Sequence, residues 1–133
     1  MLRAIADTHA IVWYLFADSR LSSTAKTFIE TASAENNQIG FSSLTLAEIV
    51  YLIEKERIPK ETFARLITAL DQSDSVLTEI VFDRRVAETL SRVERSKIPE
   101  LPDRIIAATA VYLGVPLISR DGKIHVSGIE TIW

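Results

Sequence analysis

The sequence predicts an α/β fold in which a parallel central sheet carries helices on both faces. Short apolar runs suited to strands alternate with longer stretches of helical periodicity, and this alternation is typical of a parallel sheet. A length of 133 residues corresponds to one domain, and 47% hydrophobic residues supply enough side chains for a buried core. No repeat, low-complexity segment or linker interrupts the pattern, so we expect one domain over residues 1–133.

Composition and charge exclude several classes of site. The chain has no cysteine, which excludes a disulfide framework, a thiolate metal site and a cysteine nucleophile. No apolar run approaches the roughly 20 residues that a membrane span needs, and no signal-like segment is visible, so we expect a cytoplasmic protein with no membrane partner. The net charge of −3 does not give the overall basic footprint of many nucleic-acid-binding domains.

The first third of the chain predicts a strand, two helices and a second strand. Residues 2–6 are a short apolar run that ends at Asp7, and Asp7 or Thr8 is placed to cap the helix that follows. A serine begins a second helix over about 22–34. After a polar loop, residues 38–42 (QIGFS) form the second strand candidate.

The middle of the chain begins with a predicted capping box. In Thr45-Leu46-Ala47-Glu48 the Thr45 hydroxyl would cap the new helix, and Glu48 would bond back to the cap residue. The apolar run behind it continues to a charged end near residue 57, and Pro59 then breaks the helix. The remaining pattern predicts a helix, a strand and a helix over residues 61–72, 75–82 and about 83–96.

The last third predicts a buried helix and a buried strand. Pro102 suits a first helical turn, and Asp103 lies beside the positive end of the helix dipole. The helix is apolar almost all round, and Gly114 supplies its stop. Residues 115–118 form a short interior strand, and residues 129–133 form a last edge strand.

Four carboxylates share one placement in this pattern. Asp7, Glu48, Asp103 and Asp121 each lie at a strand end or in a first helical turn, so in a parallel sheet they meet over the carboxyl ends of the strands. Each also has a local structural explanation, as a helix cap, a capping-box acid, a dipole partner or a turn residue. Like charges about 4 Å apart repel by roughly 4 kcal/mol at an effective dielectric near 20. Such a cluster therefore needs a cation or has to take up protons.

The donor types indicate a hard cation. Carboxylate oxygens without cysteine suit Mg²⁺ or Mn²⁺, whereas zinc would recruit histidine or cysteine. A carboxylate-held Mg²⁺ most often serves phosphoryl or phosphodiester chemistry. Thr8 and Ser119 are candidates to orient a carboxylate or a water, and Arg104 and Arg120 each neighbour a site acid and can grip phosphate. Charge balance of that acid is the structural alternative for both arginines.

At these residues the sequence resembles the PIN domain family, and within it the VapC-type toxin ribonucleases of bacterial and archaeal toxin–antitoxin pairs. The matching pieces cover essentially the whole chain in the family's order and spacing: Ala6-Asp7-Thr8-His9-Ala10 with Trp13; Ser42-Ser43 followed by Leu46-Ala47-Glu48-Ile49; Pro102-Asp103-Arg104-Ile105-Ile106-Ala107-Ala108-Thr109-Ala110; and Leu117-Ile118-Ser119-Arg120-Asp121.

The resemblance implies a Mg²⁺- or Mn²⁺-dependent endoribonuclease that acts on RNA. It makes Asp7, Glu48, Asp103 and Asp121 the catalytic and metal-binding acids, with Ser119 at the usual hydroxyl position. It also implies a homodimer and a small antitoxin protein as partner. One departure is Gly122, which stands where some relatives carry an extra acid. Whether the site binds a second metal ion therefore stays an open question at this point.

Three other interpretations stay open at the level of the sequence. An aspartyl phosphatase of the haloacid-dehalogenase kind also ends a strand in Asp, but it needs a second Asp where this chain has His9. A catalytically silent PIN-like module, binding or structural, would use the four acids as caps alone. A phospho-receiver would need a late-strand Lys, and the stretch PLISRD offers only Arg120. Divalent-ion binding separates the nuclease from a silent module.

Overall fold

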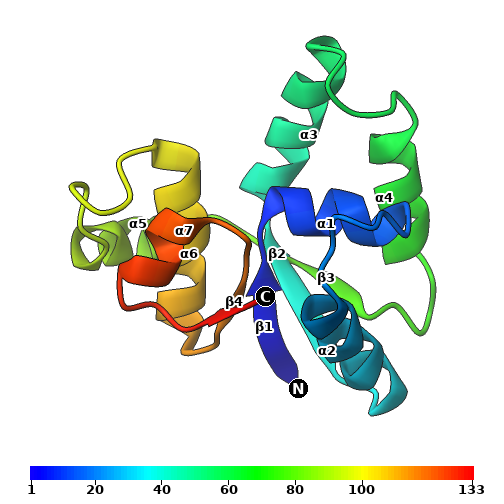
Figure 1. Cartoon of the computed structure of the whole chain (residues 1–133), viewed down its shortest axis with the longest axis horizontal. Helices are drawn as coiled ribbons and strands as arrows, with labels where there is room; N and C mark the ends of the chain where they lie inside the picture. Colours follow the sequence, from blue (N-terminus) through cyan, green and yellow to red (C-terminus); the bar gives the residue numbers. More distant parts are fainter.

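The computed structural model describes residues 1–133, except for the side chain of residue 126, and places five parallel strands in one sheet between two groups of helices (Figure 1). This confirms the predicted fold class. The strand order is β3-β2-β1-β4-β5, and each neighbouring pair is parallel. The bounds are β1 (Leu2–Ala6), β2 (Gln38–Ser42), β3 (Leu77–Ile80), β4 (Leu117–Ile118) and β5 (Thr131–Ile132).

The first four helices pack on one side of the sheet. In Figure 1 they lie to the right of β1, and their bounds are α1 (Thr8–Leu15), α2 (Ser23–Ala34), α3 (Leu44–Glu54) and α4 (Thr62–Leu70). Ala4 and Ala6 of β1 face this side, because successive side chains of a strand alternate between its two faces. Their small side chains belong to a core that also includes Ile11, Ile29 and Phe41.

The remaining helices cover the other side. They are α5 (Arg84–Thr89), which continues into a 3₁₀ turn (Leu90–Arg92), α6 (Leu101–Leu113) and α7 (Gly122–Val126). Ile5 of β1 enters this second core with Ile106 and Leu117. Six consecutive α6 residues, 105–110, are buried, as the nearly all-apolar sequence predicts. Gly114 ends the helix in the left-handed conformation at φ 67°.

The strand order brings the carboxyl ends of β1 and β4 together at the point where the chain reverses its direction of winding. β1 pairs with β2 on one side and with β4 on the other, so successive crossovers run to opposite faces and leave a crevice between them. Ligands of open α/β sheets bind in such a crevice. Asp7 and Asp121 follow these two strands, which places both carboxylates at its mouth.

The predicted capping box is wrong. Helix α3 begins at Leu44, one residue before Thr45, and its cap residue Ser43 makes no side-chain capping bond. Thr45 is fully buried in the first turn, and its hydroxyl bonds to Thr8 of α1 instead of the backbone of its own helix. Glu48 therefore lies one turn inside the helix, where it has no capping role.

Other differences concern the ends of elements. The helix predicted over 83–96 stops at Thr89 and the 3₁₀ turn after it, and the strands predicted over 75–82 and 115–118 shorten to β3 and β4. Helix α7 replaces a predicted turn, because the Asp121 side chain accepts a hydrogen bond from the Lys123 N–H and caps one further helix. Within the described part of the chain, no helix is both long enough and apolar enough to cross a membrane.

Candidate active site

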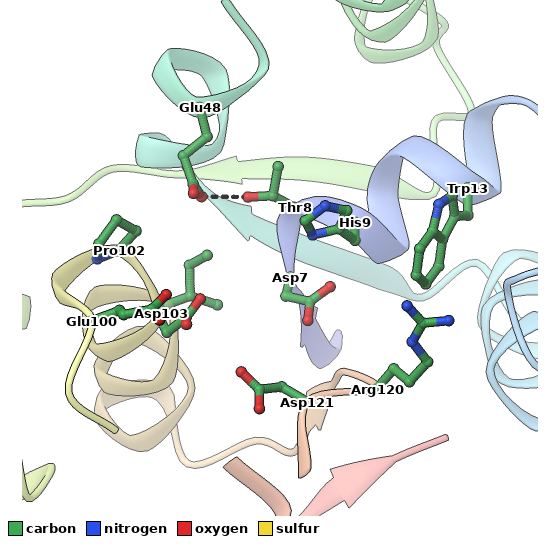
Figure 2. Close-up of a pocket in the computed structure, with 11 residues that line it drawn as sticks. Asp7, Thr8, His9, Trp13, Glu48, Glu100, Pro102, Asp103, Arg120 and Asp121 are labelled. Carbon is green, nitrogen blue, oxygen red and sulfur yellow. Dashed lines mark hydrogen bonds between the residues drawn. The ribbon is translucent and has the colours of Figure 1, made fainter. Parts of the chain in front are cut away.

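A cavity of about 330 Å³ opens at the carboxyl edge of the sheet (Figure 2). All four carboxylates singled out from the sequence line it: Asp7, Glu48, Asp103 and Asp121. They come from the end of β1, from α3, from the first turn of α6 and from the segment after β4. The structure therefore brings together acids that are separated by up to 114 positions in the chain, as 121 minus 7 gives.

Asp7 is fixed by its own helix. As the N-cap of α1, its Oδ1 accepts a hydrogen bond of 2.9 Å from the Ala10 N–H. Burial raises the pKa of the Asp7 carboxyl, and hydrogen bonds from the Ser119 hydroxyl and the Ala10 N–H oppose that increase. The capping role expected of Asp7 is thus present, and the same side chain also faces the cavity (Figure 2).

Glu48 is held by a short chain of hydroxyl groups. The Thr8 hydroxyl donates to Glu48 Oε1 at 2.5 Å, and Thr8 Oγ1 lies 3.0 Å from Thr45 Oγ1. A hydroxyl has one proton, so with the Thr8 proton on Glu48 the Thr45 hydroxyl is the donor to Thr8. Burial raises the pKa of Glu48, and the Thr8 hydrogen bond acts in the opposite direction.

Asp103 carries the clearest electrostatic signature of the cavity. Burial and the charges of Asp121, Glu100, Glu48 and Asp7 raise the pKa of its carboxyl to about 6. Because each of these acids raises the pKa of Asp103, all of them lie close enough to repel the negative charge of its carboxylate. Active sites are places where burial and neighbouring charges displace pKa values in this way, so Asp103 is a candidate functional residue.

Asp121 and Ser119 close the β4 side of the cavity. The Asp121 Oδ1 accepts from the Lys123 N–H at 2.9 Å, and the buried Ser119 hydroxyl oxygen accepts from the Asp121 N–H at 3.0 Å. Ser119 thus contacts Asp121 directly, and its hydroxyl also lowers the pKa of the Asp7 carboxyl. The hydroxyl position inferred from the sequence is a structural link between two of the acids.

Arg104 lies outside this arrangement. Its guanidinium donates to the backbone carbonyls of Leu90 at 2.9 Å and Val93 at 3.0 and 3.2 Å, and it does not line the cavity. The predicted contact with phosphate or with Asp103 is replaced by a structural role, because the planar donor group reaches the carbonyls at the end of the 3₁₀ turn. The Val93 carbonyl receives both the Nε and an Nη donor, and the Leu90 carbonyl, which already accepts from the Val93 N–H, receives a second donor.

Two features of the cavity are not apparent from the motifs. Glu100 lines it one helical turn before Asp103, and that spacing of three residues was the available signal. Arg120 and Trp13 form the opposite wall, with the guanidinium carbon 4.6 Å from the centre of the indole ring. Nothing in the sequence pairs these two residues, since they are brought together only by the β1–β4 contact.

The donor set fits a hard divalent cation. It consists of carboxylate oxygens with nearby hydroxyls, the ligands that Mg²⁺ and Mn²⁺ prefer, and a bound cation would relieve the repulsion that raises the pKa of Asp103. In the side-chain positions of the described residues, no three His, Cys, Asp or Glu groups are yet close enough to hold one ion. Mg²⁺ keeps several waters and needs only one or two protein carboxylates, so the donor set remains suited to it.

The PIN domain family model matches residues 4–127. With this sheet, this cavity and this match over nearly the whole length, the chain belongs to the PIN domain family. No curated protein matches the sequence.

Several solved structures share this fold, and a toxin–antitoxin complex and a toxin are among them. VapBC2 of Rickettsia felis, bound to a DNA fragment from its promoter, superposes with a TM-score of 0.71 at 19% identity and covers 100% of both chains. A toxin–antitoxin complex from Klebsiella pneumoniae gives 0.67 at 25% identity, over 98% of this chain and 96% of the other. VapC20 of Mycobacterium tuberculosis, a Sarcin-Ricin loop cleaving toxin, gives 0.63 at 15% identity, over 97% and 96%.

Proposed function

We propose that this protein is an endoribonuclease that uses Mg²⁺ or Mn²⁺ to hydrolyse phosphodiester bonds in RNA. The observation that carries the proposal is the meeting of four carboxylates from distant parts of the chain around one cavity, with the pKa of Asp103 raised to about 6 by the others and by burial. Membership of the PIN domain family supports the same class of reaction.

Asp7, Glu48, Asp103 and Asp121 would hold the cation. The chemistry that a bound cation would supply is activation of a water for attack on phosphorus and stabilisation of charge on the departing oxygen. No protein nucleophile is then required, which agrees with a cavity that contains acids and no cysteine. The proton that Asp103 retains below pH about 6 has to leave before its carboxylate becomes a ligand.

The groups around the acids fix their orientation. The Thr45 and Thr8 hydroxyls direct Glu48, while the Ala10 N–H and the Ser119 hydroxyl hold Asp7. Hydrogen-bonded partners of this kind orient metal ligands, and removing one typically costs about 10- to 100-fold in metal affinity or activity. The site thus has the supporting bonds that a metal-dependent hydrolase needs.

We extend the proposal to the biological role, as the toxin of a toxin–antitoxin pair. The fold is shared with VapBC2, with a Klebsiella toxin–antitoxin complex and with FitAcB of Neisseria gonorrhoeae. A small antitoxin protein that covers the cavity is the expected inhibitor, and a homodimer is the expected assembly. Light scattering on the purified chain, alone and with the product of a neighbouring gene, tests both expectations.

The deciding experiment is cleavage of a mixed RNA pool by the purified protein with Mg²⁺, with Mn²⁺ and with EDTA. Asp7→Asn is the informative variant, because Asn is as good an N-cap as Asp and keeps the acceptor for Ala10 while removing the charge. Asp74→Asn is the matched control, since Asp74 is exposed and lies outside the cavity. We expect metal-dependent cutting by the parent and by Asp74→Asn, and none by Asp7→Asn.

Three results would contradict the proposal. Full cutting by Asp7→Asn would remove the acid cluster from the chemistry, and cutting in EDTA would remove the metal. A folded parent protein that neither cuts RNA nor binds Mn²⁺ by calorimetry would mean that the acids serve as caps alone.

A further inference from the structure

The cavity has two chemically different ends. The carboxylates of Asp103 and Asp121 lie at one end, and Arg120 and Trp13 lie at the other (Figure 2). Arg120 and Asp121 are adjacent in sequence, yet Asp121 points toward the other acids and the guanidinium of Arg120 points toward Trp13. The Arg120 guanidinium thus forms no ion pair with any of the four carboxylates, within the residues that the structure describes.

Within the part of the chain that the structure describes, the guanidinium N–H groups of Arg120 have no protein partner. Among the residues that the structure describes, Arg120 forms no ion pair and no hydrogen bond, and its side chain is exposed. Its one specific contact is the face of the buried Trp13 indole, 4.6 Å from the guanidinium carbon. A guanidinium stacked in this way uses its face and leaves the donors along its edge free for a planar, bidentate acceptor.

Arg20 shows what a neutralised arginine looks like at the same ring. Its guanidinium carbon lies 5.3 Å from the Trp13 ring centre, but its Nε and Nη2 donate to the two carboxylate oxygens of Asp18 at 3.1 and 2.8 Å. Two guanidinium donors of Arg20 are therefore occupied by a carboxylate. The corresponding donors of Arg120 are not paired with Asp121, although Asp121 is the next residue in the chain.

A second cavity continues from the Trp13 end. It has a volume of about 300 Å³, shares His9 and Trp13 with the acidic cavity, and is also lined by Phe16 and Arg57. Arg57 is exposed and forms no ion pair within the described residues. A strand whose reacting phosphate lies among the acids can therefore leave past Trp13 and meet two cations in succession.

From this geometry we infer that Arg120, held on the indole of Trp13, is a phosphate-binding residue that anchors the RNA backbone beside the reacting bond, with the strand continuing into the second cavity toward Arg57. The inference rests on the proposed ribonuclease function and names how that site grips its substrate. The recognised group is a phosphodiester, so the contact does not depend on base sequence.

The test measures RNA binding by the uncleaving Asp7→Asn protein. A fluorescein-labelled oligouridine is titrated at a fixed low MgCl₂ concentration and at several KCl concentrations, and the dissociation constant is taken from fluorescence anisotropy. Arg120→Ala, added to Asp7→Asn, should weaken binding about tenfold or more, the usual range for a hydrogen bond to a charged group. It should also reduce the slope of log Kd against log salt by about 0.7, the value for one phosphate contact on a single strand.

Two further variants make the result specific. Arg120→Lys should restore the salt slope, because the charge returns, but only part of the affinity, because the planar fork is lost. Arg3→Ala is the matched control: Arg3 also rests on an aromatic ring, 6.0 Å from the centre of Phe28, but it lies on β1 outside the acidic cavity. We expect it to leave both affinity and slope unchanged. In cleavage assays Arg120→Ala should raise KM more than it lowers kcat.

The inference is overturned if Arg120→Ala behaves like Arg3→Ala, or if it weakens binding with an unchanged salt slope. It is also overturned if the Asp7→Asn protein itself shows no measurable oligouridine binding. These outcomes differ from failure of the proposed function. That failure appears as absence of metal-dependent RNA cutting by the wild-type chain, whereas the anchor can fail while wild-type cutting remains intact.

Discussion

The Thr8 hydroxyl donates a hydrogen bond of 2.5 Å to Oε1 of Glu48, joining the first residue of α1 to the second turn of α3. Both partners are constrained, because Thr8 is buried and accepts in turn from the buried Thr45. The bond therefore fixes one acid relative to Asp7, the residue before Thr8. The Thr8 hydroxyl takes no part in the proposed reaction, but its loss should change the orientation of Glu48 and therefore the activity.

Thr8→Val should reduce the metal-dependent activity about 10- to 100-fold, as removal of a group that orients a metal ligand usually does. The change keeps the shape of the side chain and removes its hydroxyl, so Glu48 loses its donor and the Thr45 hydroxyl loses its acceptor. The reduction should be smaller at saturating Mn²⁺, which identifies weaker metal binding as its origin. The measurement is initial cleavage rate against Mn²⁺ concentration.

Thr109→Val is the control for that experiment. Thr109 is equally buried, but its hydroxyl donates to the Ile105 carbonyl of its own helix, away from the acids. An equal loss of activity in both variants would assign the effect to general destabilisation and contradict the role of the Thr8–Glu48 bond.

Asp103→Asn should stabilise the metal-free protein at pH 7.5. In the folded chain the pKa of Asp103 is about 6, above its ordinary 3.8, so folding favours the protonated form and stability is lost as pH rises between these values. The shift of about two units corresponds to about 3 kcal/mol at most, and solvent screening reduces the expected gain to about 1–2 kcal/mol.

Urea unfolding in EDTA measures this gain. The gain in stability of Asp103→Asn should disappear at pH 4, where Asp103 is largely protonated in the folded wild-type protein. With Mn²⁺ present the wild type should be the more stable protein, because only the wild type keeps all four carboxylates. A lower urea midpoint for Asp103→Asn at pH 7.5 in EDTA would contradict the raised pKa.

Much of this arrangement could be predicted from the sequence, because its causes are local. Hydrophobic periodicity and caps located the helices, and the αL position of Gly114 and the N-cap of Asp7 follow from two or three neighbouring residues. The order of strands and helices then placed four acids at one sheet edge. The cavity contains all four.

What could not be predicted depends on partners far along the chain. Thr45 and Glu48 have the form of a capping box, but the hydroxyl of Thr8, 37 positions before Thr45, takes both side chains out of that role. Likewise, Arg104 follows a site acid in sequence but turns to carbonyls more than ten residues away. Tertiary packing decides which polar group becomes the hydrogen-bond partner of a long side chain. A short sequence motif does not contain that information.

The affinity for Mn²⁺ should fall by at least about tenfold between pH 7 and pH 5. Metal binds the ionised carboxylates, and with a pKa of about 6 Asp103 is ionised at pH 7 and mostly protonated at pH 5. A carboxyl at its ordinary pKa would stay ionised over this range. Calorimetric titration of Mn²⁺ at the two pH values tests this, and a flat affinity would show that Asp103 does not bind the ion.

Arg104→Ala should lower stability and leave the chemistry unchanged. The substitution leaves the Val93 carbonyl without its donors and removes the second donor of the Leu90 carbonyl, at an expected cost of about 1.5–3 kcal/mol for bonds to a charged group. Because the guanidinium lies outside the cavity, the cleavage rate and KM of the folded variant should equal those of the parent.

Arg120→Ala is the natural counterpart, because the same change of residue should have the opposite pair of effects. The exposed Arg120 guanidinium satisfies no buried group, so its loss should weaken RNA binding with little change in unfolding free energy. Urea midpoints and KM values for the two variants, measured side by side, separate an arginine that holds the fold from one that holds the substrate. A raised KM in Arg104→Ala with an unchanged urea midpoint would reverse the assignment and return Arg104 to the site.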